Sequence, residues 1–317
     1  MKLLTVVAPV YNEAEGIRTF YTALAAELKR LSAYEWRILL VNDGSTDGTR
    51  QKLAELTKED SHVQVLHFSR NFGHQAALLA GIDHAQGDVV ITMDSDLQHP
   101  PALIGALVAE YEKGHDIVYT VRQEADELGF LRLAAGALFY RTLNLLSDVP
   151  IARNASDFRL VSRRVADLLR DRMRERTMFM RGLISWMGFS HAYVPFKAGN
   201  RFAGRSKFSL SKNMRFAVFG LISFSRKPLQ AAAFLGGLFA LLGFIFALVT
   251  VVQYFFGSAT LVPGWATVIV LISVLGGVQL MFLGIIGEYI GAIFEEVKAR
   301  PHYIVADAVG FTPPERV

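Results

Sequence analysis

The chain has 317 residues, of which 52% are hydrophobic, and its mean hydropathy of +0.30 excludes an ordinary soluble enzyme of this length. It contains no cysteine, which excludes a disulfide framework and thiolate chemistry and fits a protein that faces the cytosol. The net charge of +4 would suit either nucleic acid or an anionic membrane surface, so the distribution of charge must decide.

Up to about Thr120, short β-rich runs alternate with helical stretches. Met1–Glu13 is only briefly apolar and has no signal-peptide cleavage pattern, so we expect it to contain the first strand. The alternation predicts βαβ units and a mainly parallel sheet, which is an α/β fold. Expected strands cover residues 3–8, 37–41, 63–68, 89–93 and 116–120, and expected helices cover 15–31, 48–58, 75–85 and 101–113.

Polar motifs recur where three of these strands end, in Pro9–Glu13, Val41–Thr49 and Asp94–Pro101. Parallel strands bring their carboxyl ends to one edge of the sheet, where ligands of such folds bind. For Asp43 a plain strand-to-helix turn is an equally good interpretation in isolation, and recurrence at three strand ends favours a shared ligand. Neither a dinucleotide-binding glycine fingerprint nor a P-loop is present.

The most informative of these motifs is the acidic turn. Asp94 and Asp96 follow the apolar run Val89–Met93 and precede a Pro-Pro pair that suits a helix start. Two carboxylates this close repel each other unless a cation lies between them, and such oxygen ligands suit Mg²⁺ or Mn²⁺. The alternative is that one aspartate only caps the helix that begins near Pro101.

Four further polar residues stand in informative places. His74 begins a predicted helix, where a structural role is favoured over ligand contact. Arg122 follows the fifth strand, and a surface position and a phosphate contact are equally good interpretations. Asp157 and Arg159 lie among apolar residues, where a carboxylate either pairs with an arginine or does chemistry, and the spacing favours pairing.

The rest of the chain carries membrane patterns. Residues 129–146 are apolar except for Arg132 and Arg141, which predicts an interfacial helix, with packing on the protein core as the alternative. Residues 197–227 hold eight basic and no acidic residues, interleaved with phenylalanine, a mixture that could bind nucleic acid. The next sixty residues, 228–287, have no formal charge, so we expect a basic juxtamembrane belt and no nucleic acid.

The uncharged segment predicts two transmembrane helices, over about 229–256 and 265–287. Basic residues flank the pair on the outside and none lies between the helices, which places both termini in the cytoplasm. A G-x-x-x-G pattern over Gly287–Gly291 predicts helix packing, including packing between subunits.

Six ordered motifs, found between about Val6 and Pro301, resemble the polyprenyl-phosphate glycosyltransferases of glycosyltransferase family 2. The nearest branch is similar to the bactoprenol glucosyltransferases, relatives of dolichol-phosphate mannose synthase. The motifs are Pro9-Val-Tyr-Asn-Glu13, Val41-Asn-Asp-Gly-Ser45, Ser69-Arg-Asn-Phe-Gly73, Asp94-Ser-Asp-Leu-Gln-His-Pro-Pro101, Ser156-Asp-Phe-Arg-Leu160 and Arg201-Phe-Ala-Gly-Arg-Ser-Lys207.

The resemblance implies a Rossmann-like GT-A domain over residues 1–200, the basic interfacial region at 201–227, the helix pair within 228–288 and a cytoplasmic tail at 289–317. It also implies residue roles. The nucleotide would be bound by Pro9, Tyr11, Glu13 and Asp43, and the metal by Asp94, Asp96 and Gln98. Arg122 would contact phosphate, and Asp157 would belong to the catalytic centre. A loop that closes over the acceptor site would contain Arg201, Arg205, Ser206 and Lys207.

The implied reaction is an inverting transfer of one sugar from a nucleotide diphosphate sugar to undecaprenyl phosphate, at the cytoplasmic leaflet of the inner membrane. The first choice of donor is UDP-glucose. A divalent metal, Mg²⁺ or Mn²⁺, would be the cofactor. A modified arabinose or mannose donor is an alternative, as is a non-catalytic membrane scaffold. A processive polysaccharide synthase is disfavoured because the chain has no Gln-x-x-Arg-Trp sequence. Expected partners are the bilayer, a second copy of the chain, a flippase and a periplasmic glycosyltransferase that serve cell-envelope glycosylation.

Overall fold

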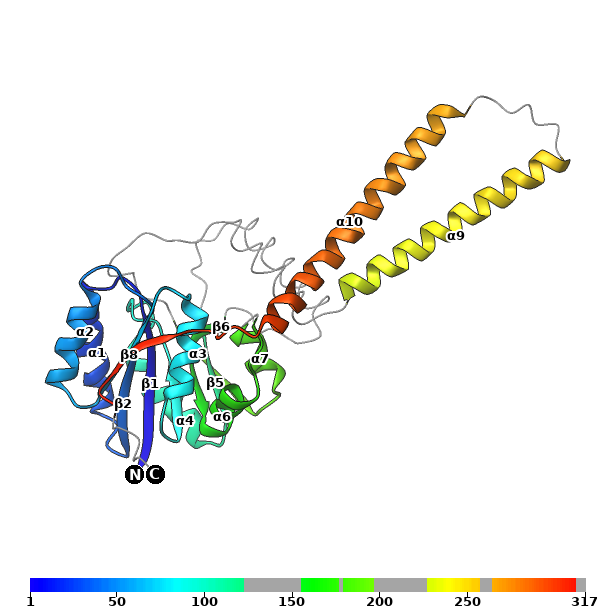
Figure 1. Cartoon of the computed structure of the whole chain (residues 1–317). Helices are drawn as coiled ribbons and strands as arrows, with labels where there is room; N and C mark the ends of the chain where they lie inside the picture. Colours follow the sequence, from blue (N-terminus) through cyan, green and yellow to red (C-terminus); the bar gives the residue numbers. More distant parts are fainter. Residues whose placement is uncertain (123–154, 177–178, 197–226, 257–263, 312–317) are drawn as a thin grey trace, which may run out of the picture. The chain divides into compact units, whose positions relative to one another are not determined.

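The computed structural model describes residues 1–122, 155–176, 179–196, 227–256 and 264–311. The chain divides into two compact units, one that contains all described strands and one that contains two long helices (Figure 1). The expected interfacial helix at 129–146 and nearly all of the basic stretch at 197–227 lie outside the described residues.

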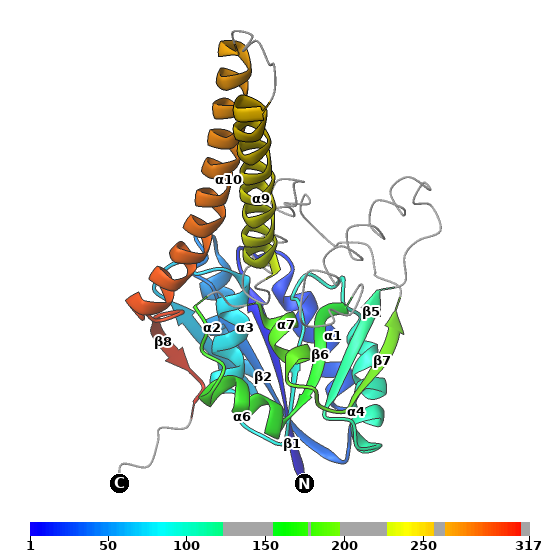
Figure 2. The ribbon, with the colours of Figure 1, turned by 90° about the vertical axis from the view of Figure 1, so that its right-hand side faces the viewer.

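A single eight-stranded sheet runs through the first unit, in the order β7-β5-β6-β4-β1-β2-β3-β8 (Figure 2). Four neighbouring pairs are parallel and three, those of β6 with β4 and β5 and of β8 with β3, are antiparallel. The expected α/β fold is thereby confirmed, with a mixed sheet. The strands are β1 (Lys2–Val10), β2 (Tyr34–Asn42), β3 (Val63–Phe68), β4 (Val89–Thr92), β5 (Ile117–Arg122), β6 (Ala155–Ser162), β7 (His191–Phe196) and β8 (Val305–Val309).

Helices cover both faces of this sheet. On one face, α1 (Ile17–Leu28), α2 (Thr49–Glu59) and α4 (Ile104–Glu112) close the main hydrophobic core, and a 3₁₀ turn, Pro101–Leu103, precedes α4. On the other face lie α3 (His74–His84) and α6 (Arg163–Asp171), and α7 (Met180–Trp186) follows α6 along the chain.

Helix α3 approaches β1 closely at Gly81. A Cβ at Gly81 would overlap the Val7 side chain, so only glycine permits this approach without a shift. The close packing fixes the position of α3, and therefore of His74 at its first residue, relative to the sheet.

The pattern of the sequence did not predict β6, and its insertion decides where the site forms. It runs antiparallel between β4 and β5, so its beginning meets the edge at which those two strands end. Thr92 Oγ1 donates a hydrogen bond of 2.6 Å to the Asp157 carbonyl, and Thr120 Oγ1 donates one of 2.6 Å to the Phe158 carbonyl. Asp157 is therefore held beside the acidic turn.

The segment after the second long helix returns to the sheet. We call Ala299–Gly310 the C-terminal strap; its strand β8 pairs antiparallel with β3 at the outer edge. The Tyr303 hydroxyl donates a hydrogen bond of 2.7 Å to Asp83 on α3, and its ring stacks on Phe68 with a centroid distance of 5.2 Å. The strap thus joins a segment expected only as a tail to the first unit.

The described part of the second unit contains α9 (Lys227–Phe256) and α10 (Trp265–Lys298), of 30 and 34 residues. At 1.5 Å per residue they are ~45 and ~51 Å long, against ~30 Å for a hydrocarbon core. Within the described residues, two windows, Leu229–Phe246 and Val274–Lys298, are long and apolar enough to cross a membrane, with mean hydropathies of 2.1 and 1.6. Helix α10 continues past Gly287, where the expected span ends.

Candidate active site at the carboxyl edge of the sheet

The loops that follow β1 and β2 are joined to each other by hydrogen bonds. The Asn12 backbone N–H donates to Ser45 Oγ over 3.0 Å, and Thr46 N–H donates to Asn12 Oδ1 over 2.9 Å. Glu13 N–H donates to Thr49 Oγ1 over 2.9 Å. The first two polar motifs therefore share one edge, as their spacing predicts.

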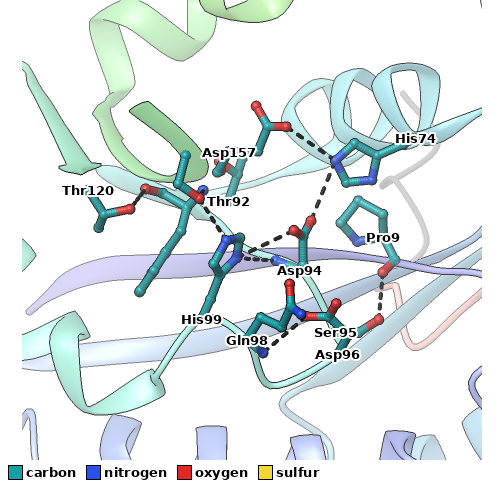
Figure 3. Close-up of polar contacts among 12 residues, drawn as sticks. Pro9, His74, Thr92, Asp94, Ser95, Asp96, Gln98, His99, Thr120 and Asp157 are labelled. Atoms are coloured by element: carbon teal, nitrogen blue, oxygen red, sulfur yellow. Dashed lines mark hydrogen bonds and ion pairs between the residues drawn. The ribbon is translucent and has the colours of Figure 1, made fainter. Parts of the chain in front are cut away.

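The acidic turn after β4 is attached to the same edge (Figure 3). Ser95 Oγ donates a hydrogen bond of 2.9 Å to the Pro9 carbonyl, and Gln98 N–H donates one of 3.1 Å to Asp96 Oδ1. Leu97 lies in the left-handed region of backbone conformation, at φ +61°. This conformation costs a leucine free energy, and such backbone strain is often found at functional turns. These contacts fix the backbone of the turn and therefore the positions of its two aspartates.

This turn fits a divalent cation only in part. Asp94 Oδ1 is buried and accepts no hydrogen bond from the described residues, which is the state expected of an atom reserved for a ligand. No group of three or more His, Asp and Glu side chains that could hold a metal occurs among the residues the structure describes. Mg²⁺ is commonly held by one or two carboxylates together with substrate phosphates, and Asp94 and Asp96 fit that donor set.

His99 joins the acidic turn to Ser156 through hydrogen bonds of its two ring nitrogens. The Asp94 backbone N–H donates to His99 Nδ1 over 3.0 Å, so the neutral ring carries its proton on Nε2, which lies 2.6 Å from Ser156 Oγ. Burial lowers the pKa of His99, which keeps the ring neutral and this tautomer in place. His99 thus connects the acidic turn to the beginning of β6.

Asp157 is enclosed by cations. Arg159 Nη2 donates to Asp157 Oδ1, and Arg181 of α7 binds both carboxylate oxygens at 3.0 Å. The expected pairing with an arginine is confirmed, with Arg181 as a second partner that no local pattern predicted. Burial alone would raise the pKa of Asp157, but Arg181, His74 and Arg159 together hold it well below its usual range.

His74 lies between the two carboxylate centres (Figure 3). Its Nε2 is 3.4 Å from Asp94 Oδ1 and 3.5 Å from Asp157 Oδ2. Partial burial lowers the pKa of His74, but the hydrogen bond to Asp157 and the charge of Asp94 outweigh that effect and raise it. Its ring therefore links the two carboxylate centres, and the structural role favoured for His74 from sequence stays a prediction.

Asp43 contacts protein backbone. Its carboxylate accepts the N–H groups of Phe72 and Gly73 at 2.7 and 3.0 Å, and burial raises its pKa while these bonds lower it. A Cβ at the neighbouring Gly44, at φ +65°, would overlap the Arg70 backbone. Asp43 thus fixes the loop that delivers His74, and its nucleotide role stays a prediction.

The remaining predicted residues divide into two groups. Tyr11, Glu13, Gln98 and Arg122 lie at or beside the same carboxyl edge, where Tyr11 and Arg122 are exposed. The acceptor-loop residues lie outside the described part of the chain, and these are Arg201, Arg205, Ser206 and Lys207.

Comparison with known proteins identifies the family of the chain. Residues 5–169 match the model of "Glycosyl transferase family 2". An uncharacterized glycosyltransferase of Bacillus subtilis is 38% identical over 306 residues, which cover 96% of this chain and 94% of the relative. The bactoprenol glucosyl transferase of Shigella phage SfII is 39% identical over 303 residues, which cover 95% of this chain and 97% of the relative.

Among solved structures, the glucosyl-3-phosphoglycerate synthase of Mycobacterium tuberculosis, in complex with Mn²⁺, UDP and phosphoglyceric acid, matches with a TM-score of 0.47 and 18% identity. That match covers 70% of this chain and 76% of the other. The family model spans more than half of the chain, and the sequence relatives cover nearly all of it. The chain therefore belongs to glycosyl transferase family 2 and is a glycosyltransferase.

Proposed function

We propose that this enzyme transfers one sugar from a nucleotide diphosphate sugar to a polyprenyl phosphate. The observation that carries the proposal is the convergence of Asp94, His74 and Asp157, which puts a candidate diphosphate site beside a buried charged centre. UDP-glucose and undecaprenyl phosphate are the first substrates to test, because bactoprenol glucosyl transferases are among the relatives.

On the donor side, the loops after β1 and β2 hold the base and ribose through Pro9, Tyr11, Glu13 and Asp43. Asp94, Asp96 and Gln98 hold the divalent metal. A divalent cation there supplies charge neutralisation for the leaving nucleotide diphosphate. Arg122, at the end of β5, provides a further positive charge for the same phosphates.

On the acceptor side, the chemistry needs little base catalysis. A phosphate monoester has its second pKa at about 6 and is largely dianionic at neutral pH. Asp157 has its pKa held well below the usual range, so it is a weak base and an ionised anchor for positive groups. Direct displacement then inverts the anomeric carbon and gives a β-linked product from an α-linked donor.

The proposed location is the cytoplasmic face of the inner membrane. Helices α9 and α10 are long and apolar enough to span it. The strap that follows α10 pairs with β3, and the strands before α9 belong to the same sheet. Both ends of a membrane hairpin then belong on one side, and the basic residues before α9 favour the cytoplasmic side. The same proposal includes a homo-oligomer, and a flippase and periplasmic glycosyltransferase that use the product.

The test is a transfer assay with the full-length protein in bilayer nanodiscs. Undecaprenyl phosphate is offered with UDP-glucose, a mannose donor or a modified arabinose donor, with Mg²⁺ or Mn²⁺ and with a chelator. We expect one sugar per lipid by mass spectrometry and loss of product with the chelator. A polymer would indicate a processive synthase, and no product with any donor would overturn the proposal.

A further inference from the structure

His67 is a buried histidine near the carboxyl end of β3, and it is only 3% exposed. In the parallel pairing of β2 with β3 it stands opposite Asn42, which is also 3% exposed. The Asn42 side-chain nitrogen Nδ2 lies 2.9 Å from His67 Nδ1. Two buried polar side chains therefore meet at the edge of the sheet where the loop after β2 begins.

The backbone of that loop fixes the direction of this hydrogen bond. The Ser45 N–H donates to Asn42 Oδ1 over 3.0 Å, so the oxygen of the amide faces the loop and its NH₂ group faces the histidine. An amide NH₂ group can only donate, so His67 Nδ1 accepts and the ring proton is on Nε2. A protonated ring would set a donor against a donor, and a reversed amide would set its NH₂ group against the Ser45 N–H. Only the neutral ring in this tautomer keeps both bonds.

The surroundings of His67 keep its ring neutral. Burial lowers the pKa of His67, the charge of Arg50 on α2 lowers it further, and the charge of Asp307 on β8 raises it. Arg50 and Asp307 pair with each other over 3.2 Å at the surface, so their effects on the ring oppose one another. The pKa of His67 is therefore below its usual value, and Nδ1 is available as an acceptor at neutral pH.

The bonds continue from Asn42 into the loop after β1. Ser45 Oγ accepts the Asn12 backbone N–H over 3.0 Å, and Asn12 Oδ1 accepts the Thr46 N–H over 2.9 Å. Asn12 lies in the left-handed region at φ +55°, which asparagine adopts more readily than most residues. An unbroken chain of contacts thus runs from His67 through Asn42 and Ser45 to Asn12, across the ends of β3, β2 and β1.

Two of the residues proposed to bind the nucleotide adjoin this chain of contacts. Asp43 follows Asn42 directly, and Tyr11 precedes Asn12 directly. We propose that His67 is a positioning residue for the donor nucleotide, which acts through the Asn42 amide on the loops after β1 and β2. This assignment rests on the proposed function and adds to it a residue that does not contact substrate.

The experiment compares His67→Leu with His67→Asn in the full-length protein in nanodiscs. Leucine removes the acceptor and leaves the buried Asn42 NH₂ group without its partner, whereas asparagine places an oxygen near the position of Nδ1. We expect His67→Leu to raise the dissociation constant of UDP about 10-fold, the effect of one buried donor left unsatisfied. His67→Asn should rescue binding to within about three-fold of wild type, which a residue that only fills space would not do.

Gln64→Leu is the matched control for loss of stability. Gln64 also lies on β3, is 3% exposed and donates through Nε2 to the Gly310 carbonyl over 3.3 Å, but it stands near the amino end of the strand. It should lower the Tm as His67→Leu does and leave the affinity for UDP unchanged. If UDP affinity falls in step with Tm in all three variants, His67 only stabilises the fold and the proposal is overturned. Equal UDP affinity in wild type and His67→Leu would overturn it as well.

Hydrogen exchange in the ligand-free protein distinguishes failure of the positioning role from failure of the proposed function. The Ser45 N–H is protected by its bond to Asn42, so His67→Leu should speed its exchange about 10-fold and His67→Asn should leave it close to wild type. If this result is found but wild type binds neither UDP nor GDP, the hold of His67 on the loop stands and the nucleotide site of the proposed function is wrong. If Ser45 exchanges equally in wild type and His67→Leu, the connection through Asn42 is wrong whatever the enzyme binds.

Discussion

The acidic turn and the Asp157 centre each contain an aspartate, and the two carboxylates have opposite surroundings. Asp94 is 35% exposed and its buried Oδ1 accepts no hydrogen bond from the described residues. Asp157 is 9% exposed, and arginines bind both of its oxygens. The two carboxylates are separated by one imidazole, that of His74.

The difference lies in the neighbours of each carboxylate. Asp94 is positioned through its backbone N–H, which donates to His99 Nδ1, and its Oδ1 accepts no hydrogen bond from the described residues. Asp157 could bind a metal only by releasing Arg159 and Arg181, which would leave two cations without their counter-ion. Asp94 can therefore hold a metal, whereas Asp157 is suited to hold two arginine side chains in place.

The largest expected effect comes from Asp96→Asn in the acidic turn. The amide keeps the shape of the carboxylate but removes a charge from the metal site, so we expect transfer to fall on the order of 10³-fold. The transfer assay measures this, and Mn²⁺ titration followed by electron paramagnetic resonance reports the metal directly.

Asp171→Asn, on the exposed surface of α6, is the matched control and should keep full activity and unchanged Mn²⁺ binding. Full activity of Asp96→Asn with metal present would remove the metal role from the acidic turn.

Asp157→Asn should lower turnover about 10²-fold and change the donor dissociation constant little, because the residue orients the acceptor side. It should also destabilise the fold by about 3–5 kcal/mol, since Arg159 is left as an uncompensated buried charge. Turnover, UDP affinity and thermal unfolding are measured on one preparation.

The double variant Asp157→Asn with Arg159→Met separates the two effects. Removal of the buried cation should recover stability but not turnover. If the double variant recovers turnover, Asp157 is only a counter-ion. If donor affinity alone falls in the single variant, Asp157 belongs to the donor site.

Sequence patterns predicted one half of this comparison better than the other. The acidic turn is local: two aspartates, a preceding apolar run and a following proline pair lie within fifteen residues of Gly87. The five leading strands and their shared edge follow from the same alternation of apolar and helical segments, and the structure confirms them.

The Asp157 centre could not be assembled in that way. Asp157 and Arg159 interrupt the apolar pattern of β6, so the segment does not read as a buried strand, although it lies in the middle of the sheet. His74 and Arg181 come from helices far away in the chain, and only the antiparallel insertion of β6 brings Asp157 to them. Strand β8 was missed because it follows a long helix, outside the alternation of strands and helices in the first 120 residues.

A smaller effect is expected from His99→Ala, which weakens the acidic turn without removing a carboxylate. The Asp94 backbone N–H and Ser156 Oγ would lose their shared hydrogen-bond partner. Loss of a residue that orients a metal ligand typically lowers metal affinity or activity about 10- to 100-fold. Mn²⁺ affinity should fall while the KM for the acceptor changes little. His115→Ala, at a partly exposed histidine that lies beside Glu110, is the control. A change in acceptor KM alone would contradict the assignment of His99 to the metal side.

The smallest effect should come from Tyr303→Phe in the C-terminal strap. It should affect the His74 loop beside the Asp157 centre and not the acidic turn. The hydroxyl donates to Asp83, and the ring stacks on Phe68, which contacts Phe72 edge to face at 5.7 Å. Phe72 and Gly73 bind Asp43 and precede His74, so loss of the bond should loosen the His74 loop and leave the acidic turn intact.

We expect Tyr303→Phe to lower the free energy of unfolding by about 1.5 kcal/mol, the low end for a hydrogen bond to a charged group. Transmission through Phe68 and Phe72 should cost about 0.5 kcal/mol in nucleotide or acceptor binding, roughly two-fold. Mn²⁺ affinity should not change. Tyr193→Phe, on the edge strand β7, removes an exposed hydroxyl and serves as the control. Weaker Mn²⁺ binding in Tyr303→Phe would show that the strap supports the acidic turn as well, and the two carboxylate centres would then not be independently supported.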